Sequence, residues 1–227
     1  MPRLFTALEI SRDAALSLSL LRGGLIGPKG SVRWIDPEKY HITLRFIGDV
    51  EGHVADEIVH AFDRIDRQSF TLRLSGVNVF GSKKPHSIYA GVAPSAELSA
   101  LQAEMERICQ RLRLPADPRK FTPHVTLARL KNLPDIQLAR YLSERGNFTT
   151  IPFTVSRFVL MSSKESTGGG PYVTEEIWPL HNTEVAANID APPNLSARAD
   201  DYTGFSASAD SHVSFSARAS AASRTIR

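Results

Sequence analysis

Apolar and polar residues alternate along several short stretches of the chain, as they do in a β-strand that buries one face. Other short stretches are rich in the β-branched and aromatic residues that favour strands. Together these patterns predict strands over residues 3–9, 32–35, 40–47, 70–80, 87–92, 124–130, 153–161 and 172–178.

A different spacing, with apolar residues three and four positions apart, predicts helices between these strands. The clearest helix has an apolar stripe on one face and charged residues on the other, and a second helix follows the same spacing. Ser11 can cap a third helix that Gly23-Gly24 ends, and residues 134–144 suggest a short fourth. The two stripes consist of Leu98, Leu101, Met105, Ile108 and Leu112, and of Val54, Ile58, Phe62 and Ile65.

Several consecutive strands are joined by short connections, which favours an α+β fold with antiparallel sheets over a doubly wound parallel sheet. The chain has no glycine motif of the Rossmann or P-loop kind that would cradle a nucleotide phosphate. We expect one folded domain over residues 1–182. Residues 183–227 are rich in Ser and Ala and poor in apolar residues, so we expect a disordered tail there.

Charge and cysteine content narrow the setting in which the protein acts. The net charge of +3 divides into +4 for residues 1–182 and −1 for the remainder. The only cysteine, Cys109, cannot form an internal disulfide, and its position beside the stripe of the clearest helix is typical of a core residue. No apolar run approaches the roughly 20 residues that span a bilayer. We therefore expect a cytoplasmic protein without a membrane segment.

One tetrad occurs twice, as His41-Ile42-Thr43-Leu44 and, 83 residues later, as His124-Val125-Thr126-Leu127. Both copies lie in predicted strands, so the His and Thr of each copy share one face and the two aliphatic residues share the other. A single His-x-Thr would carry little information, because many strands have a polar outer face. The repetition indicates two related lobes, and a pseudo-twofold axis between them would bring both polar faces to one cleft.

Two imidazoles that face each other suit acid–base catalysis, because the unperturbed pKa of histidine is about 6.5. One would take a proton from water while the other gives a proton to a leaving oxygen. The hydroxyls of Thr43 and Thr126 can donate hydrogen bonds to the oxygens of an anion between them, and a phosphodiester fits this arrangement. A zinc site is the competing interpretation. Neither tetrad includes a further Asp, Glu or Cys ligand, so we expect no metal.

The paired tetrads resemble the H-x-[ST]-hydrophobic motifs of the two-histidine (2H) phosphoesterase superfamily. The flanking residues resemble its bacterial and archaeal branch, the RNA 2′,3′-cyclic phosphodiesterases, also called 2′-5′ RNA ligases. The likeness runs from Arg3 to about Leu180. Besides the tetrads, the segments that carry it are Arg3-Leu4-Phe5-Thr6-Ala7, Arg33-Trp34, Arg45-Phe46-Ile47-Gly48, Phe121-Thr122-Pro123, Ala128-Arg129, Gly169-Gly170-Pro171-Tyr172 and Trp178-Pro179-Leu180.

The resemblance implies a bilobal α+β fold, with two pseudo-symmetric lobes of antiparallel sheet around a central cleft and helices outside. It also implies hydrolysis of an RNA 2′,3′-cyclic phosphate to a 2′-phosphomonoester without metal or cofactor, accompanied in some members by 2′-5′ joining of RNA ends. By motif position, His41 would donate a proton to the 3′ leaving oxygen and His124 would activate water. Thr43 and Thr126 would hold the phosphate oxygens.

Two arginines beside the tetrads lead to different expectations. Arg129 closes the second motif, and the resemblance implies that its charge contributes to substrate binding. Strict alternation places Arg129 on the face opposite His124, so this role requires a bulge or a strand end after Leu127. Arg45, in contrast, alternates onto the face of His41.

Two other hypotheses remain open: a phosphodiesterase for small cyclic nucleotides or ADP-ribose cyclic phosphate, and a non-catalytic module that binds RNA ends. The expected partner of the leading hypothesis is RNA with a 2′,3′-cyclic phosphate end, such as a tRNA fragment, bound by a monomer. Basic and aromatic residues outside the tetrads are further candidates for RNA contact. Each basic residue is equally explained as a solvated charge, and aromatic residues in strands are more often core residues. These residues are Arg33, Lys83, Lys84, Arg119, Lys120, Trp34, Phe46 and Phe121.

Overall fold

The computed structural model describes residues 3–81, 83–163 and 172–181, and in these residues the strands pair antiparallel throughout the named sheets. The predicted tail and Gly169-Gly170-Pro171 lie outside the described residues. The strands are β1 (Arg3–Glu9), β2 (Val32–Trp34), β3 (His41–Asp49), β4 (Phe70–Leu72), β5 (Leu74–Phe80), β6 (Ser87–Val92), β7 (His124–Leu130), β8 (Phe153–Val155), β9 (Arg157–Ser163) and β10 (Tyr172–Pro179).

All four predicted helices are present, with boundaries within a few residues of those expected. Ser11 caps the first helix as predicted, because its hydroxyl oxygen accepts a hydrogen bond from the backbone N–H of Ala14 at 3.2 Å. A short 3₁₀ helix, η1, precedes β3. The helices are α1 (Arg12–Ser19), η1 (Pro37–Lys39), α2 (Gly52–Phe62), α3 (Ala96–Arg111) and α4 (Asp135–Arg145).

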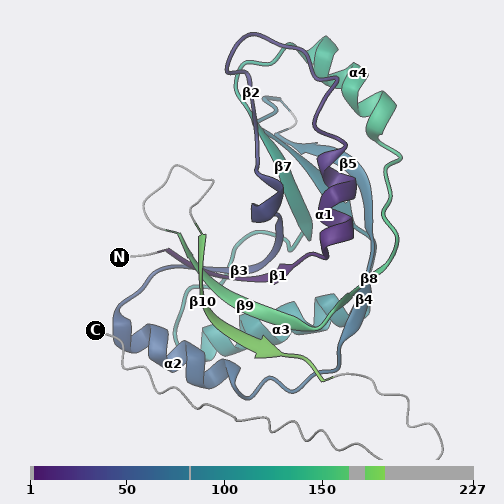
Figure 1. The fold of residues 1–227 in the computed structure, drawn as a ribbon. Helices are drawn as coiled ribbons and strands as arrows, with labels where there is room; N and C mark the ends of the chain where they lie inside the picture. The colour runs from purple at the N-terminus through teal and green to yellow at the C-terminus, as the bar shows by residue number, and fades with distance from the viewer. Residues whose placement is uncertain (1–2, 82, 164–171, 182–227) are drawn as a thin grey trace, which may run out of the picture. The chain divides into compact units, whose positions relative to one another are not determined.

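The main sheet has two halves, with β10, β9, β1 and β3 in one and β7, β6 and β5 in the other (Figure 1). The halves meet at one pair of residues. The strand order is β10-β9-β1-β3-β7-β6-β5, and β2 also pairs with β7. Strands β3 and β7 are matched only at Ile42 and Val125. The predicted α+β fold with antiparallel sheets is confirmed, and the sheets of the two expected lobes are continuous through this pair.

Two predicted strands are each divided in the structure. The stretch 70–80 separates into β4 and β5, and 153–161 separates into β8 and β9; β4 and β8 leave the main sheet and pair with each other. Phe70, Leu72 and Leu74 are all buried, so the alternation of buried residues continues across the break. Periodicity in the sequence reports which face is buried and not which strand is the partner, so it could not reveal this division.

Helices cover the face of the sheet that carries the aliphatic residues of the tetrads. Helix α3 packs against β3, and α2 packs against α3. Ile42, Leu44, Val125 and Leu127 are buried in the core, as is Cys109 on α3, which confirms the prediction for this cysteine. Burial raises the pKa of the Cys109 thiol to about 11. In the described part of the chain, no helix is long and apolar enough to cross a membrane.

The prediction for Arg45 is wrong, because a β-bulge interrupts the alternation. Thr6 and Ala7 of β1 pair with Arg45 and Thr43, so Leu44 has no partner on that strand. The bulge turns Arg45 into the interior, where 6% of its side chain is exposed and its Nε lies 2.5 Å from Glu106 Oε2 on α3. Arg45 therefore joins the sheet to α3 and does not face the site.

We predict that Glu106→Gln destabilises the fold by about 3 kcal/mol, because it leaves the buried charge of Arg45 without its partner. The free energy of unfolding in urea measures this loss. The control is Arg140→Gln, which breaks an exposed pair with Glu144 on α4, where we expect a change below about 0.5 kcal/mol. Equal losses for the two substitutions would show that the buried pair contributes no more to the free energy of unfolding than the exposed pair.

Candidate active site

The single pairing between the two halves of the sheet brings the two tetrads together. Ile42 lies opposite Val125 in an antiparallel register. One position to either side of this pair, His41 is aligned with Thr126 and Thr43 is aligned with His124. Because side chains alternate, these four polar groups lie on the opposite face from Ile42 and Val125. All four are half-buried.

The two histidines have the same hydrogen bond in each tetrad. Nδ1 of His41 lies 2.8 Å from the carbonyl oxygen of Lys39, and Nδ1 of His124 lies 2.7 Å from that of Thr122. A carbonyl can only accept, so Nδ1 carries the hydrogen in both rings. The neutral tautomer therefore has its lone pair on Nε2, which can accept a proton, and the protonated ring donates from the same atom.

Aromatic rings flank both imidazoles. The centroid of the His41 ring lies 5.2 Å from that of Phe5 and 5.1 Å from that of Tyr172. The His124 ring lies 4.7 Å from Phe80 and 5.3 Å from Tyr89. These rings restrict the movement of the imidazoles and exclude water from their faces.

The surroundings of the two histidines favour their neutral forms. Burial lowers the pKa of His41, the hydrogen bond to Lys39 opposes this effect, and the neighbouring His124 lowers the pKa further. Burial is also the main cause that lowers the pKa of His124. The influence of His124 on the pKa of His41 is consistent with the alignment that the strand register gives.

Arg129 lies near His124 because of a second bulge. Ile88 and Tyr89 of β6 pair with Ala128 and Thr126, so Leu127 has no partner on β6. This is the feature that the proposed role of Arg129 requires. Burial is the main cause that lowers the pKa of His124, and the charge of the exposed Arg129 guanidinium adds to it. Burial raises the pKa of Tyr172, and the charge of Arg129 opposes this shift. The role of Arg129 in binding stays a prediction.

The two bulges occupy equivalent positions in the repeat, at Leu44 and at Leu127. The six residues that begin at His41 have the same sequence of buried, half-buried and exposed positions as the six that begin at His124. The repetition seen in the sequence therefore extends to backbone geometry.

The family model described as the 2′-5′ RNA ligase superfamily matches residues 31–167, a segment that contains both tetrads and both bulges. The chain belongs to this superfamily. The predicted relationship is thus confirmed. The paired tetrads are the clearest sign of it in the sequence.

Curated relatives in the superfamily agree with this assignment. A protein of Aeropyrum pernix named RNA 2′,3′-cyclic phosphodiesterase is 34% identical over 162 residues, which cover 69% of this chain and 91% of the relative. One of Aquifex aeolicus with the same name is 29% identical, with 64% of this chain and 81% of the relative covered. A Geobacillus stearothermophilus protein of that name is 31% identical, and only 41% of its length is matched.

Solved structures show the same fold. TT0787 of Thermus thermophilus has a TM-score of 0.66 at 21% identity, covering 80% of this chain and 99% of that one. E. coli LigT, in its complex with 3′-AMP, has a TM-score of 0.64 at 22% identity, covering 79% and 99%. The fold of the superfamily is therefore preserved although about four residues in five differ from these two proteins.

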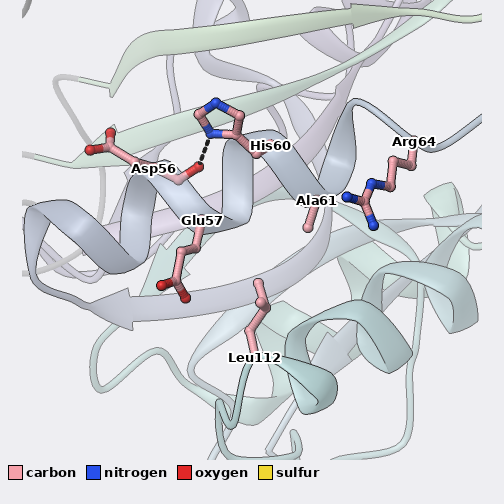
Figure 2. Close-up of a pocket in the computed structure, with 6 residues that line it drawn as sticks. All are labelled: Asp56, Glu57, His60, Ala61, Arg64 and Leu112. Carbon is pink, nitrogen blue, oxygen red and sulfur yellow. Dashed lines mark hydrogen bonds between the residues drawn. The ribbon is translucent and has the colours of Figure 1, made fainter.

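The two tetrads are separate from a pocket on the helical side of the molecule. That pocket has a volume of about 400 Å³ and lies at α2 and the end of α3. Figure 2 shows its charged rim and the hydrogen bond from His60 Nδ1 to the carbonyl oxygen of Asp56, 2.7 Å long. It contains no residue of either tetrad, and its lining is Asp56, Glu57, His60, Ala61, Arg64 and Leu112.

Sequence reasoning did not assign the aromatic residues beside the histidines to the site. Phe80, Tyr89 and Tyr172 lie on β5, β6 and β10, far from the tetrads in sequence. The only signal for Phe80 and Tyr89 was their position in predicted strands, whereas Tyr172 also ends a segment that resembles the superfamily. Of the aromatic residues that were considered for RNA contact, Phe46 is 48% exposed, while Trp34 and Phe121 pack against the core.

We predict that the two histidines make the fold less stable in acid. Their pKa values are lowered in the folded protein, whereas the unfolded chain titrates near pH 6.5. As the pH falls through about 6.5, the unfolded chain takes up protons that the folded protein does not, so the free energy of unfolding decreases. Above that pH their contribution to stability is complete.

Urea unfolding between about pH 7.5 and pH 5 tests this expectation. The double variant His41→Gln, His124→Gln is expected to lose less stability over this range than the parent protein. His60→Gln, on the exposed surface of α2, serves as the control and should leave the pH dependence unchanged. An unchanged pH dependence in the double variant would contradict the effect of burial on these rings.

Proposed function

We propose that the protein is an RNA 2′,3′-cyclic phosphodiesterase that hydrolyses a terminal 2′,3′-cyclic phosphate to a 2′-phosphomonoester. The observation that carries this proposal is the alignment of two imidazoles, each beside a threonine, at the pairing of Ile42 with Val125. The names of the curated relatives support the same activity. Joining of RNA ends through a 2′-5′ bond is a further proposed activity, suggested by the name of the superfamily.

The chemistry divides between the two rings. His124 Nε2 takes a proton from water as the water oxygen attacks phosphorus, and the new P–O bond forms. The bond from phosphorus to the 3′ oxygen breaks, and this oxygen takes a proton from Nε2 of His41. The phosphate stays on the 2′ oxygen. The carbonyl oxygens of Lys39 and Thr122 hold Nδ1 of each ring and so direct Nε2 toward the reacting atoms.

This reaction requires one proton on the pair of rings, because the acid must be charged and the base neutral. In the free protein both pKa values are lowered, mainly by burial. A bound phosphate brings a negative charge that favours the imidazolium form. Substrate binding therefore promotes the singly protonated state in which the pair can react.

The threonines and Arg129 serve the phosphate. The hydroxyls of Thr43 and Thr126 donate hydrogen bonds to its non-bridging oxygens, and negative charge that develops there in the transition state strengthens these bonds. Arg129 adds a positive charge beside His124. Its electrostatic effect on His124 and Tyr172 supports this proximity.

The physiological setting is also part of the proposal. We infer a monomer that acts on RNA in the cytoplasm, with tRNA fragments among its substrates. The single cysteine, which leaves the fold without an internal disulfide, is compatible with a reducing compartment.

We predict that His41→Ala and His124→Ala each reduce turnover by about two to four orders of magnitude, the range for loss of a general acid or base. The assay uses an oligonucleotide with a 2′,3′-cyclic phosphate, and the products are separated to distinguish the 2′-phosphate from the 3′-phosphate. His60→Ala is the control and should retain the parent rate. Normal turnover by either folded variant would remove that histidine from the mechanism, and binding without any product would favour a non-catalytic module.

We further predict that turnover continues after exhaustive treatment with EDTA, since the two imidazoles provide both acid and base. In the residues that the structure describes, no three His, Cys, Asp or Glu side chains come together in a set that could hold a metal ion. Loss of activity in EDTA, followed by recovery with Zn²⁺ or Mn²⁺, would favour a metal-dependent reaction instead.

A further inference from the structure

Arg119, in the loop between α3 and β7, has a fixed guanidinium that the proposed reaction does not use. Its Nε and Nη2 donate to the two carboxylate oxygens of Asp117, each at 3.0 Å, and its backbone N–H also donates to Asp117 at 3.0 Å. Its guanidinium carbon lies 5.5 Å from the centre of the Phe46 ring. The side chain is nevertheless 69% exposed. An exposed charge is thus held in one orientation.

The loop that carries Arg119 is tied to the strand of His41. The backbone N–H of Asp117 donates to Glu106 Oε1 at 3.3 Å, and Glu106 pairs with Arg45 of β3. Arg45 also donates to the carbonyl oxygen of Pro115. An exposed ion pair contributes at most about 1 kcal/mol to stability, so stability alone does not account for orienting Arg119 in this way.

The position of Arg119 is next to the paired tetrads. Phe46, on which it lies, contacts Phe5 with ring centroids 5.9 Å apart, and Phe5 contacts His41 at 5.2 Å. The charge of Arg119 also contributes to lowering the pKa of His124. In the repeat, Phe46 is the counterpart of Arg129, because each lies five residues after the histidine of its tetrad. Arg119 therefore lies on Phe46, next to the first tetrad, and its charge acts on His124 as that of Arg129 does.

The chemistry of this guanidinium favours a phosphate as its ligand. Asp117 engages two of its five N–H bonds and Phe46 covers one face, so the remaining N–H bonds lie along the guanidinium edge. Planar N–H edges are suited to phosphate oxygens. We propose that Arg119 binds the phosphodiester that links the terminal nucleotide to the rest of the RNA, and so selects RNA chains over mononucleotides. This inference rests on the proposed function.

The test compares a dinucleotide and a mononucleoside, each with a 2′,3′-cyclic phosphate. Arg119→Gln is expected to lower kcat/KM about tenfold for the dinucleotide, as for loss of a hydrogen bond to a charged group, and to change the mononucleoside by less than about twofold. Arg119→Lys keeps the charge without the planar edge and should give an intermediate value. The control is Arg140→Gln, since Arg140 is 75% exposed and also pairs with a carboxylate, that of Glu144 on α4, through its Nε.

A dinucleotide with a neutral methylphosphonate linkage isolates the contact itself. In the parent protein, kcat/KM is expected to be about tenfold lower for this neutral dinucleotide than for the charged one. In Arg119→Gln, kcat/KM is expected to be the same for the two dinucleotides. Equal losses on dinucleotide and mononucleoside would place the action of Arg119 at the cyclic phosphate or at His124. No loss on either substrate would make it a solvated surface pair. Both results overturn the proposal.

Binding separates failure of this subsite from failure of the proposed function. The dissociation constants of a dinucleotide with a 3′-phosphate and its methylphosphonate counterpart are measured for the same variants, which requires no turnover. If the parent protein hydrolyses neither cyclic substrate, the proposed function fails. The Arg119 subsite would still be supported by a roughly tenfold preference for the charged linkage that Arg119→Gln abolishes, and it would be overturned if that preference were absent.

Discussion

The pairing of Ile42 with Val125 joins the two halves of the sheet, and both side chains are fully buried. Every polar group of the site depends on this register. A shift of one residue on either strand would turn its His and Thr toward the core and its aliphatic residues toward the site. The burial of Ile42, Leu44, Val125 and Leu127 under the helices therefore fixes the alignment of His41 and His124 through the hydrophobic effect.

Burial also determines the proton state of the pair, and here two requirements oppose each other. The aromatic rings around His41 and His124 exclude water and favour neutral imidazoles, whereas an acid must carry a proton. In the proposed reaction, the negative charge of a bound phosphate would resolve the conflict by stabilising one imidazolium within the site. The same surroundings would then strengthen the proposed hydrogen bonds from Thr43 and Thr126, because electrostatic interactions are stronger where water is excluded.

Much of the fold follows from local patterns, and the bulges show where those patterns fail. The alternation of residues predicted β1, β6 and β7 at their observed boundaries, and the spacing of Leu98, Leu101 and Met105 predicted α3. Alternation alone placed Arg45 beside His41 and Arg129 away from His124. A bulge inserts an unpaired residue without any required residue type, so nothing in the pattern of residues around Leu44 indicated it.

The site itself was predictable only in part, for a related reason. The repeat identified the histidines and threonines because the same four positions recur along the chain. Tyr89 and Tyr172 reach the site through pairing between distant strands, which a single sequence does not encode locally. The guanidinium of Arg119 depends on Asp117 and Phe46 together, and that combination becomes visible only when the loop before β7 is seen against β3.

We expect the two histidines to act as one unit at the junction of the sheet, and a double-mutant cycle measures whether they do. The rate constants for cleavage of the cyclic phosphate are compared for His41→Ala, His124→Ala and the double variant under single-turnover conditions. If the rings are an acid–base pair, the double variant is expected to be no more than about threefold slower than the slower single variant, because neither ring completes the reaction without the other. A double variant whose loss equals the product of the two single losses would show independent residues and contradict the account.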